Sequence, residues 1–189
     1  MHRSPMILAL AGALLVSACS SSKEAKNQMV LAARYMPLEV GNEWVYDFGL
    51  ENNRQTQTIR VTGTQEFAGK TWYTVREFFD GKEQADTLHL RTEGSTLLLY
   101  HTRLGQVMKL VDFAQTQVDS SSPEVSYVST AHHTQVVGDR TWENCVVTSS
   151  GYVDAEVATY APNVGLIQSF WFRGRKELVR ARINGKVIE

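Results

Sequence analysis

Short runs of strand-forming residues, separated by a turn about every ten residues, constrain the fold of this chain more than any other feature. Trp44–Phe48 alternates so that its aromatic side chains share one face, and Thr71–Phe78 lies between two glycine-containing turns. Asp80-Gly81 is typical of a hairpin, because glycine adopts positive φ without a steric penalty. The other expected strands are Gln57–Val61, Thr87–Arg91, Leu97–Tyr100, Gln106–Phe113, Val125–Val137, Asn144–Ser149, Tyr152–Tyr160, Gly165–Phe172 and Glu177–Ile183, with a last hairpin at Asn184-Gly185.

The pattern predicts an all-β domain of roughly ten antiparallel strands. No long segment has helical periodicity, which argues against a parallel sheet with crossover helices. Sequential hairpins favour an antiparallel meander that forms a curved sheet, a half-barrel or a barrel. The polar residues 114–124 form the one evident loop between two halves of the domain. At most one short N-terminal helix is expected, within residues 23–36, because the composition there favours a helix and Pro37 ends it.

Residues 1–18 have the layout of a secretory signal. Arg3 supplies a positive charge, residues 5–16 are apolar and uncharged, and small residues follow. The apolar run is shorter than the roughly 20 residues that a membrane-spanning helix needs. A buried N-terminal helix is the alternative, but such a helix would carry polar residues on one face. None occurs between Pro5 and Val16.

The segment Val16-Ser17-Ala18-Cys19 resembles the lipobox of bacterial lipoproteins. The resemblance implies cleavage before Cys19 and attachment of acyl chains, such as palmitate, to its thiol and its new amino group. One acyl chain binds a membrane weakly, whereas two or more anchor a protein stably. We therefore expect a lipoprotein signal peptide (1–18), a lipidated tether that includes the short helix (19–37) and a single antiparallel β domain (38–189).

Ser20 follows Cys19 at the position where an aspartate often causes retention in the inner membrane. By resemblance to that sorting rule, we expect the protein to be lipid-anchored in the cell outer membrane and to face the periplasm. The membrane is then a partner through the lipid alone, because 19 Lys and Arg stand against 20 Asp and Glu without a basic cluster. The same balance argues against nucleic-acid binding.

Sequence motifs for catalysis or metal binding are missing. The chain has no G-x-S-x-G motif and no glycine-rich phosphate loop. The adjacent histidines 132–133 would point to opposite faces of a strand, although His89 and His101 could meet across a hairpin. Asp154 and Glu156 are more typical of the wet face of an edge strand. We therefore expect no enzymatic activity, no catalytic residue, no metal and no cofactor.

Cys145 is the one thiol besides Cys19, so lipidation of Cys19 leaves no pair for an intramolecular disulfide. Free cysteine is among the most buried residue types, and Cys145 lies in a strand-like run beside two valines. We expect it to be a buried packing residue.

Aromatic residues on the expected strands are the remaining signal for function. Ligand pockets are lined largely by apolar side chains with a few polar groups, although each of these aromatics is more typical of a core residue. Leu97–Tyr100 and Phe170–Phe172 are apolar on both strand faces, so another layer, residues 23–36, a partner or a lipid is expected to cover the second face. The candidate ligand-lining residues are Trp44, Tyr46, Trp72, Phe78, Tyr100 and Trp171.

Two regions of the chain resemble a group of uncharacterised bacterial exported lipoproteins. The first is residues 35–46, where an aromatic-x-Pro-Leu precedes a Gly-Asn-x-Trp-x-Tyr. The second comprises Trp142–Val146 and the Tyr-Ala-Pro-x-Val-Gly-Leu signature of Tyr160–Leu166. The group is similar to curved-sheet lipoproteins of the envelope, including those that carry or insert lipoproteins in an open half-barrel. The resemblance implies a fold and a compartment, and no catalytic residues.

Three functions are consistent with the sequence. The first is a non-catalytic envelope lipoprotein that binds an apolar ligand or lipid in the concave face of its β domain. The second is a protein-interaction or assembly lipoprotein of the outer membrane without a small ligand, which would expose an apolar patch or a strand edge. The third is a hydrolase whose site has no recognisable motif.

Replacement of the anchor residue tests the lipidation. Cys19→Ala removes the sulfur that forms the thioether, so we expect the protein to be lost from the membrane fraction and to appear in the soluble periplasmic extract. Unchanged membrane partitioning of the variant would contradict the anchor.

Overall fold

The computed structural model describes residues 32–50, 52–114, 128–150, 156–172 and 174–189. The signal peptide, Cys19 and most of the tether lie outside these residues. No helix within the described ranges is long and apolar enough to cross a membrane.

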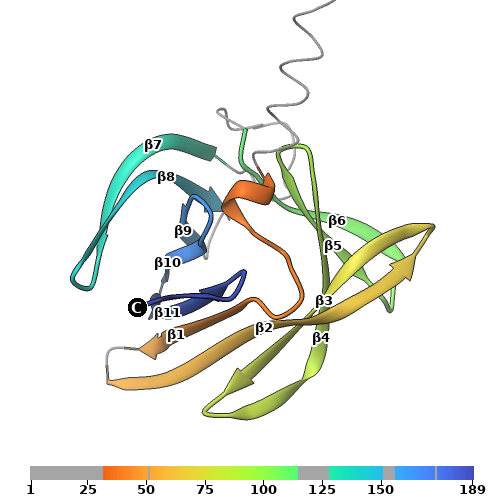
Figure 1. The fold of residues 1–189 in the computed structure, drawn as a ribbon, viewed down its shortest axis with the longest axis horizontal. Coiled ribbons are helices and arrows are strands. Elements are labelled where there is room, and N and C mark those ends of the chain that lie inside the picture. Colours follow the sequence, from red (N-terminus) through yellow and green to blue (C-terminus); the bar gives the residue numbers. More distant parts are fainter. Residues whose placement is uncertain (1–31, 51, 115–127, 151–155, 173) are drawn as a thin grey trace, which may run out of the picture.

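The described residues form one twelve-stranded antiparallel sheet (Figure 1). The strands are β1 (Glu43–Leu50), β2 (Asn53–Phe67), β3 (Lys70–Phe79), β4 (Lys82–Glu93), β5 (Thr96–His101), β6 (Gln106–Asp112), β7 (Val128–Val137), β8 (Arg140–Ser150), β9 (Glu156–Ala161), β10 (Gly165–Trp171), β11 (Gly174–Ile183) and β12 (Lys186–Ile188).

The sheet consists of two meanders. The first runs from β1 to β6 and the second from β7 to β11, each with neighbours in sequence paired in space. They join where β1 pairs with β11, from Glu43–Arg182 to Gly49–Arg175. The strands β6 and β7 therefore lie at opposite ends of the path, and the sheet bends around its interior without closing (Figure 1). The predicted all-β curved sheet is confirmed.

The predicted strands recur, and some of them have longer bounds. β2 extends over 15 residues and β4 over 12, where the sequence indicated only their central parts. The last hairpin, predicted at Asn184-Gly185, is confirmed, and its second strand is the three-residue β12. The helix is confirmed as one short turn at residues 32–35, just before Pro37. The expected loop at 114–124 lies outside the described residues except for Ala114, and it falls between the two meanders.

The inner face of the sheet holds the core, with β1 at its centre. Because directly paired residues share a face, Trp44 lies beside Ala181 of β11 and Tyr46 beside Leu178. Ala181 is small, and the indole of Trp44 extends beyond β11 so that Nε1 donates to the carbonyl oxygen of Val164 at 2.5 Å.

Tyr46 makes a parallel contact with the same segment, since its hydroxyl donates to the carbonyl oxygen of Leu166 at 3.0 Å. β10 pairs with β11 only over Gln168–Trp171. The two aromatic side chains thus supply donors to the part of the β9–β10 hairpin that β11 does not reach. Both are buried, at 1% and 2% exposure. They fix the curvature of the second meander.

Gly165 is required by this contact. Its φ is +108°, and a Cβ there would lie 3.0 Å from Trp44 Nε1. The motifs Gly-Asn-x-Trp-x-Tyr and Tyr-Ala-Pro-x-Val-Gly-Leu, 120 residues apart, therefore pack directly on each other.

The short helix joins the two meanders at the end of the interior where β1 begins. Ala32 N–H donates to the carbonyl of Gly94 in the first meander, at 3.3 Å. The Tyr35 hydroxyl donates to the carbonyl of Asn144 in the second, at 2.8 Å. The ring of Tyr35 stacks on Phe113, whose ring meets Tyr160 edge-on. This end of the interior is therefore filled.

A methyl group at Gly165 tests the contact. In Gly165→Ala we expect the free energy of unfolding to fall by about 1–3 kcal/mol, because the backbone conformation is strained for alanine and its Cβ displaces Trp44. Urea unfolding monitored by tryptophan fluorescence measures the change. Gly63→Ala is the matched control, since Gly63 has no positive φ and its Cβ would meet nothing within 4 Å. Equal stability of the two variants would contradict this account.

Candidate functional site

The far end of the inner face, where β1 ends, carries an aromatic cluster that is only partly buried. The Phe48 ring packs against Phe79 of β3 at 5.3 Å and stacks on Trp171 of β10 at 5.2 Å. Lys176 of β11 extends over this cluster, and its Nζ lies 5.4 Å from the ring centroids of both Tyr46 and Phe48. The interior thus has one filled end and one partly open aromatic end.

Burial lowers the pKa of Lys176, since its cation is taken from water between two aromatic rings. The carboxylates of Glu77 and Glu156 oppose this effect and favour the charged form. Both lie on the inner face by the strand register, so this end of the interior contains charges of both signs.

A second aromatic group, here called the outer cluster, lies on the opposite face of the first meander. It comprises Phe67, Trp72, His89, Arg91 and Tyr100. Phe67 stacks on Tyr100 at 4.4 Å and meets the His89 ring at 4.7 Å. The ring centroids of Trp72 and Tyr100 are 5.5 Å apart. The guanidinium of Arg91 lies over the Trp72 ring, 5.0 Å from its centroid. The cluster covers the second face of Leu97–Tyr100 with side chains of the same sheet.

The sheet opens between β4 and β5. These strands pair only over Leu90–Glu93 of β4 and Thr96–Leu99 of β5. On the N-terminal side of Leu90, β4 remains paired with β3, and Leu88 is the ladder partner of Val75. On the C-terminal side of Leu99, β5 remains paired with β6, and Tyr100 is the ladder partner of Val107. The two strands therefore separate in a wedge.

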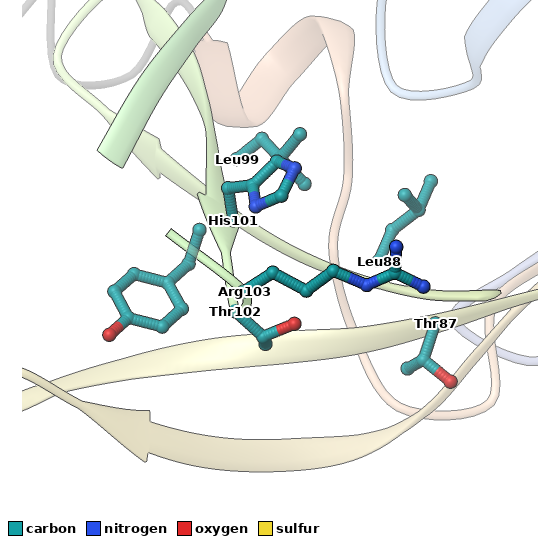
Figure 2. A pocket seen from close by; sticks show the side chains of 7 residues that line it. Thr87, Leu88, Leu99, His101, Thr102 and Arg103 are labelled. Carbon is teal, nitrogen blue, oxygen red and sulfur yellow. The ribbon is translucent and has the colours of Figure 1, made fainter. Parts of the chain in front are cut away.

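A pocket of about 280 Å³ lies in this wedge and is called the β4–β5 pocket below. Leu88 and Leu99 line it, and both belong to the inner face and pack against the core. Its other lining residues are Thr87, Tyr100, His101, Thr102 and Arg103. Figure 2 shows the Arg103 side chain extended towards Leu88 and Thr87, with His101 beside Leu99. The pocket thus combines an apolar floor with a polar rim.

The hydrogen bonding of His101 indicates which of its ring nitrogens is available as a donor. The backbone N–H of Leu104 donates to His101 Nδ1 at 3.3 Å. Neutral His101 therefore carries its proton on Nε2, which is a donor. With the hydroxyls of Thr87 and Thr102 and the Arg103 guanidinium, the rim is rich in hydrogen-bond donors.

The structure separates the six candidate ligand-lining residues. Trp44 and Tyr46 lie in the core, bonded to backbone carbonyls. Trp171 lies in the inner aromatic cluster. The other three lie on the outer face: Trp72 in the outer cluster, Phe78 under the Arg60 guanidinium, and Tyr100 between the outer cluster and the β4–β5 pocket. Of the six, Tyr100 alone lines the pocket, and Trp72 lies next to it.

Two expectations about faces and pairs need correction. The second face of Phe170–Phe172 is largely exposed: Trp171 is an inner residue, whereas Phe170 and Phe172 are 43% and 74% exposed. His89 and His101 do not pair across the hairpin, because the β4–β5 ladder ends at Leu90–Leu99. Cys145 is buried as expected, and burial raises the pKa of its thiol. Cys19 and Asp154 lie outside the described residues.

The sequence analysis missed most of the pocket. Leu88 and Leu99 lie in segments whose sequence pattern is that of ordinary strands, and Thr87, Thr102 and Arg103 belong to no recognisable binding motif. The separation of β4 from β5 depends on pairing register, which the sequence pattern does not reveal. Across the ranges described, no group of three His, Cys, Asp or Glu side chains is placed to hold a metal ion.

No protein-family model and no curated protein sequence matches the chain. Several solved structures are similar to it. One is described as an exported protein of Bacteroides fragilis with a YmcC-like fold; it is 10% identical over 82% of this chain and 99% of its own, with a TM-score of 0.50. Another is described as a lipoprotein of Parabacteroides distasonis, 10% identical over 82% of this chain and 98% of its own, with a TM-score of 0.48.

A third is described as an outer membrane lipoprotein-sorting protein domain of Vibrio parahaemolyticus, 12% identical over 90% of this chain and 96% of its own, with a TM-score of 0.28. The similar solved structures are thus exported proteins and lipoproteins. At these identities, the likeness to the Bacteroides fragilis protein concerns the fold alone.

His89 predicts how acid affects stability. It is 6% exposed, its Nδ1 has no hydrogen-bond partner among the described residues, and burial lowers its pKa from 6.5. Between that lowered pKa and 6.5, the unfolded chain binds more protons than the folded one, so stability decreases on acidification below 6.5.

We expect His89→Leu to remove this part of the pH dependence, measured by urea unfolding at a series of pH values. His133→Leu, at an exposed position of β7, is the control. The difference in free energy of unfolding between the wild type and His89→Leu should therefore vary with pH. A difference that is constant with pH would contradict the role given to His89.

Proposed function

We propose that this protein is a non-catalytic lipoprotein of the bacterial envelope that binds one apolar chain in the β4–β5 pocket. One observation carries the proposal: the separation of β4 from β5 leaves Leu88 and Leu99 lining a pocket in the wall of the sheet. Both side chains also pack against the core, so the pocket is bordered by residues of the interior.

The size and lining of the pocket favour a single chain. Its volume of about 280 Å³ is just below the usual range for small-molecule sites, which suits a narrow ligand. Leu88 and Leu99 supply its apolar part, and the polar lining residues supply groups that can orient a ligand. A chain that covers the two leucines removes apolar surface from water, which stabilises the complex by about 25 cal/mol per Å².

The N-terminal sequence supports the envelope as the location. The signal layout and the lipobox-like segment ending at Cys19 favour export and lipid anchoring. Ser20 favours the outer membrane and a domain facing the periplasm. The fold shared with an exported protein is compatible with this location.

A second function, docking of an envelope protein partner, is favoured by a different observation. Val157 and Phe170 are direct partners on the outer face of β9 and β10, and both are exposed. Phe172 follows them, with most of its side chain in contact with solvent. Exposed apolar groups of this kind occur at protein–protein contacts.

Native mass spectrometry of the full chain carrying Cys19→Ala tests ligand binding. We expect a bound mass that solvent extraction removes and that identifies the ligand class. Leu88→Gln places an amide in the apolar floor and should abolish the bound mass. Leu104→Gln, an exposed leucine in the β5–β6 turn, is the matched control and should retain it.

A clean apo mass for both Cys19→Ala and its Leu104→Gln derivative would contradict ligand binding. A bound mass that persists in Leu88→Gln would place the ligand elsewhere. In either case, crosslinking of the anchored protein through the Phe170 surface becomes the informative experiment for the partner hypothesis.

A further inference from the structure

The polar rim of the β4–β5 pocket has a definite electrostatic character. Five of its seven lining residues carry side-chain hydrogen-bond donors: Thr87, Tyr100, His101, Thr102 and Arg103. None of the seven lining residues is acidic. The inner aromatic end is different, because Glu77 and Glu156 influence Lys176 there. The pocket is therefore the better of the two regions for a negatively charged group.

Arg103 differs from the arginines of the neighbouring strands. Arg54, Arg60, Arg76 and Arg91 each form an ion pair with a carboxylate. For Arg103, no carboxylate within the described part of the chain lies at ion-pair distance. Its side chain extends across the pocket rather than away from it (Figure 2). Its guanidinium, which carries five N–H donors, thus borders the space that a ligand would occupy.

The two threonines and His101 complement this guanidinium. Thr87 lies on β4, whereas His101 and Thr102 come from the end of β5 and the following turn, so donors border the wedge from both strands. His101 donates through Nε2 because its Nδ1 accepts from Leu104 N–H. An acidic group has only acceptors, and Arg pairs with carboxylate or phosphate in a bidentate manner.

We propose that the β4–β5 pocket binds a single-chain anionic amphiphile, with its carboxylate or phosphate held by Arg103 and the rim hydroxyls and its chain against Leu88 and Leu99. This inference rests on the proposed function and adds the headgroup that the site selects. The position of Arg103 at the surface of the pocket lets the chain enter first and the charge remain partly solvated, which keeps its desolvation small.

The experiment compares a spin-labelled long-chain fatty acid with its methyl ester. The two share one chain and differ only in the negative charge. Trp72 lies 5.5 Å from Tyr100, which lines the pocket, so a nitroxide on the bound chain quenches tryptophan fluorescence. The protein is the full chain carrying Cys19→Ala, because the lipid anchor would draw the probe into membranes.

We expect the acid to bind about ten- to a hundredfold more tightly than the ester, as is typical of hydrogen bonds to charged groups. Arg103→Met keeps an apolar stem but removes the charge, and should bring the acid to the affinity of the ester. Arg182→Met, an exposed arginine of β11 far along the sheet from β5, is the matched control and should keep the preference.

The outcomes separate the two proposals. Equal binding of acid and ester, or a preference that survives Arg103→Met, overturns the headgroup assignment and leaves apolar ligand binding standing. Failure of both probes to bind overturns the proposed function as well. Loss of ester binding in Arg103→Met overturns the assignment too, because the residue then acts on the chain or the fold.

Competition distinguishes the sources of the charge. Displacement of the spin-labelled acid by stearate alone assigns the pocket to carboxylates, and displacement also by lysophosphatidylglycerol assigns it to phosphate headgroups too. Both results support an anion site. Equal displacement by the zwitterionic lysophosphatidylcholine would contradict charge selection.

Discussion

The contact of Trp44 and Tyr46 with the β9–β10 hairpin is the interaction on which the shape of the molecule depends. These side chains extend from β1 beyond β11 and donate to the carbonyls of Val164 and Leu166. The donors satisfy backbone groups of a segment that has left β11, and an unpartnered buried carbonyl would cost about 1–3 kcal/mol. These bonds hold β1, together with its ladder partner β11, to the turn that precedes β10.

Curvature of this sheet comes from strands that pair over only part of their length. β10 separates from β11 towards Gly165, where the aromatic donors replace the ladder, and β12 pairs with the end of β11. β4 separates from β5 in the same way, but there no aromatic donor replaces the ladder among the described residues, and the β4–β5 pocket results. Partial pairing of neighbouring strands thus accompanies a filled interior at β10–β11 and an open pocket at β4–β5.

Hairpins and core anchors were predictable because each depends on local chemistry. Asp80 and Asn184 adopt positive φ in turns that the Asp-Gly and Asn-Gly pairs indicated, and Trp44 and Tyr46 share one face by simple alternation. The pairing of β1 with β11 could not be predicted, because it joins segments more than a hundred residues apart that no turn connects. The orientation of Trp171 was not predictable for a related reason: only the ladder with β11 shows which of three consecutive aromatics faces inwards. Except for Tyr100, the pocket residues escaped prediction, since register rather than residue type makes Leu88 and Leu99 accessible.

A crystal structure of the full chain carrying Cys19→Ala, grown with stearate, tests the central claim most directly. The account predicts β4 and β5 apart beyond Leu90 and Leu99, with density for one chain against Leu88 and Leu99 and its carboxylate at Arg103. A ladder that continues between β4 and β5 through Leu88 and His101, leaving no space for a chain, would contradict it. Density for stearate only in the inner aromatic end, beside Phe48 and Trp171, would contradict it as well.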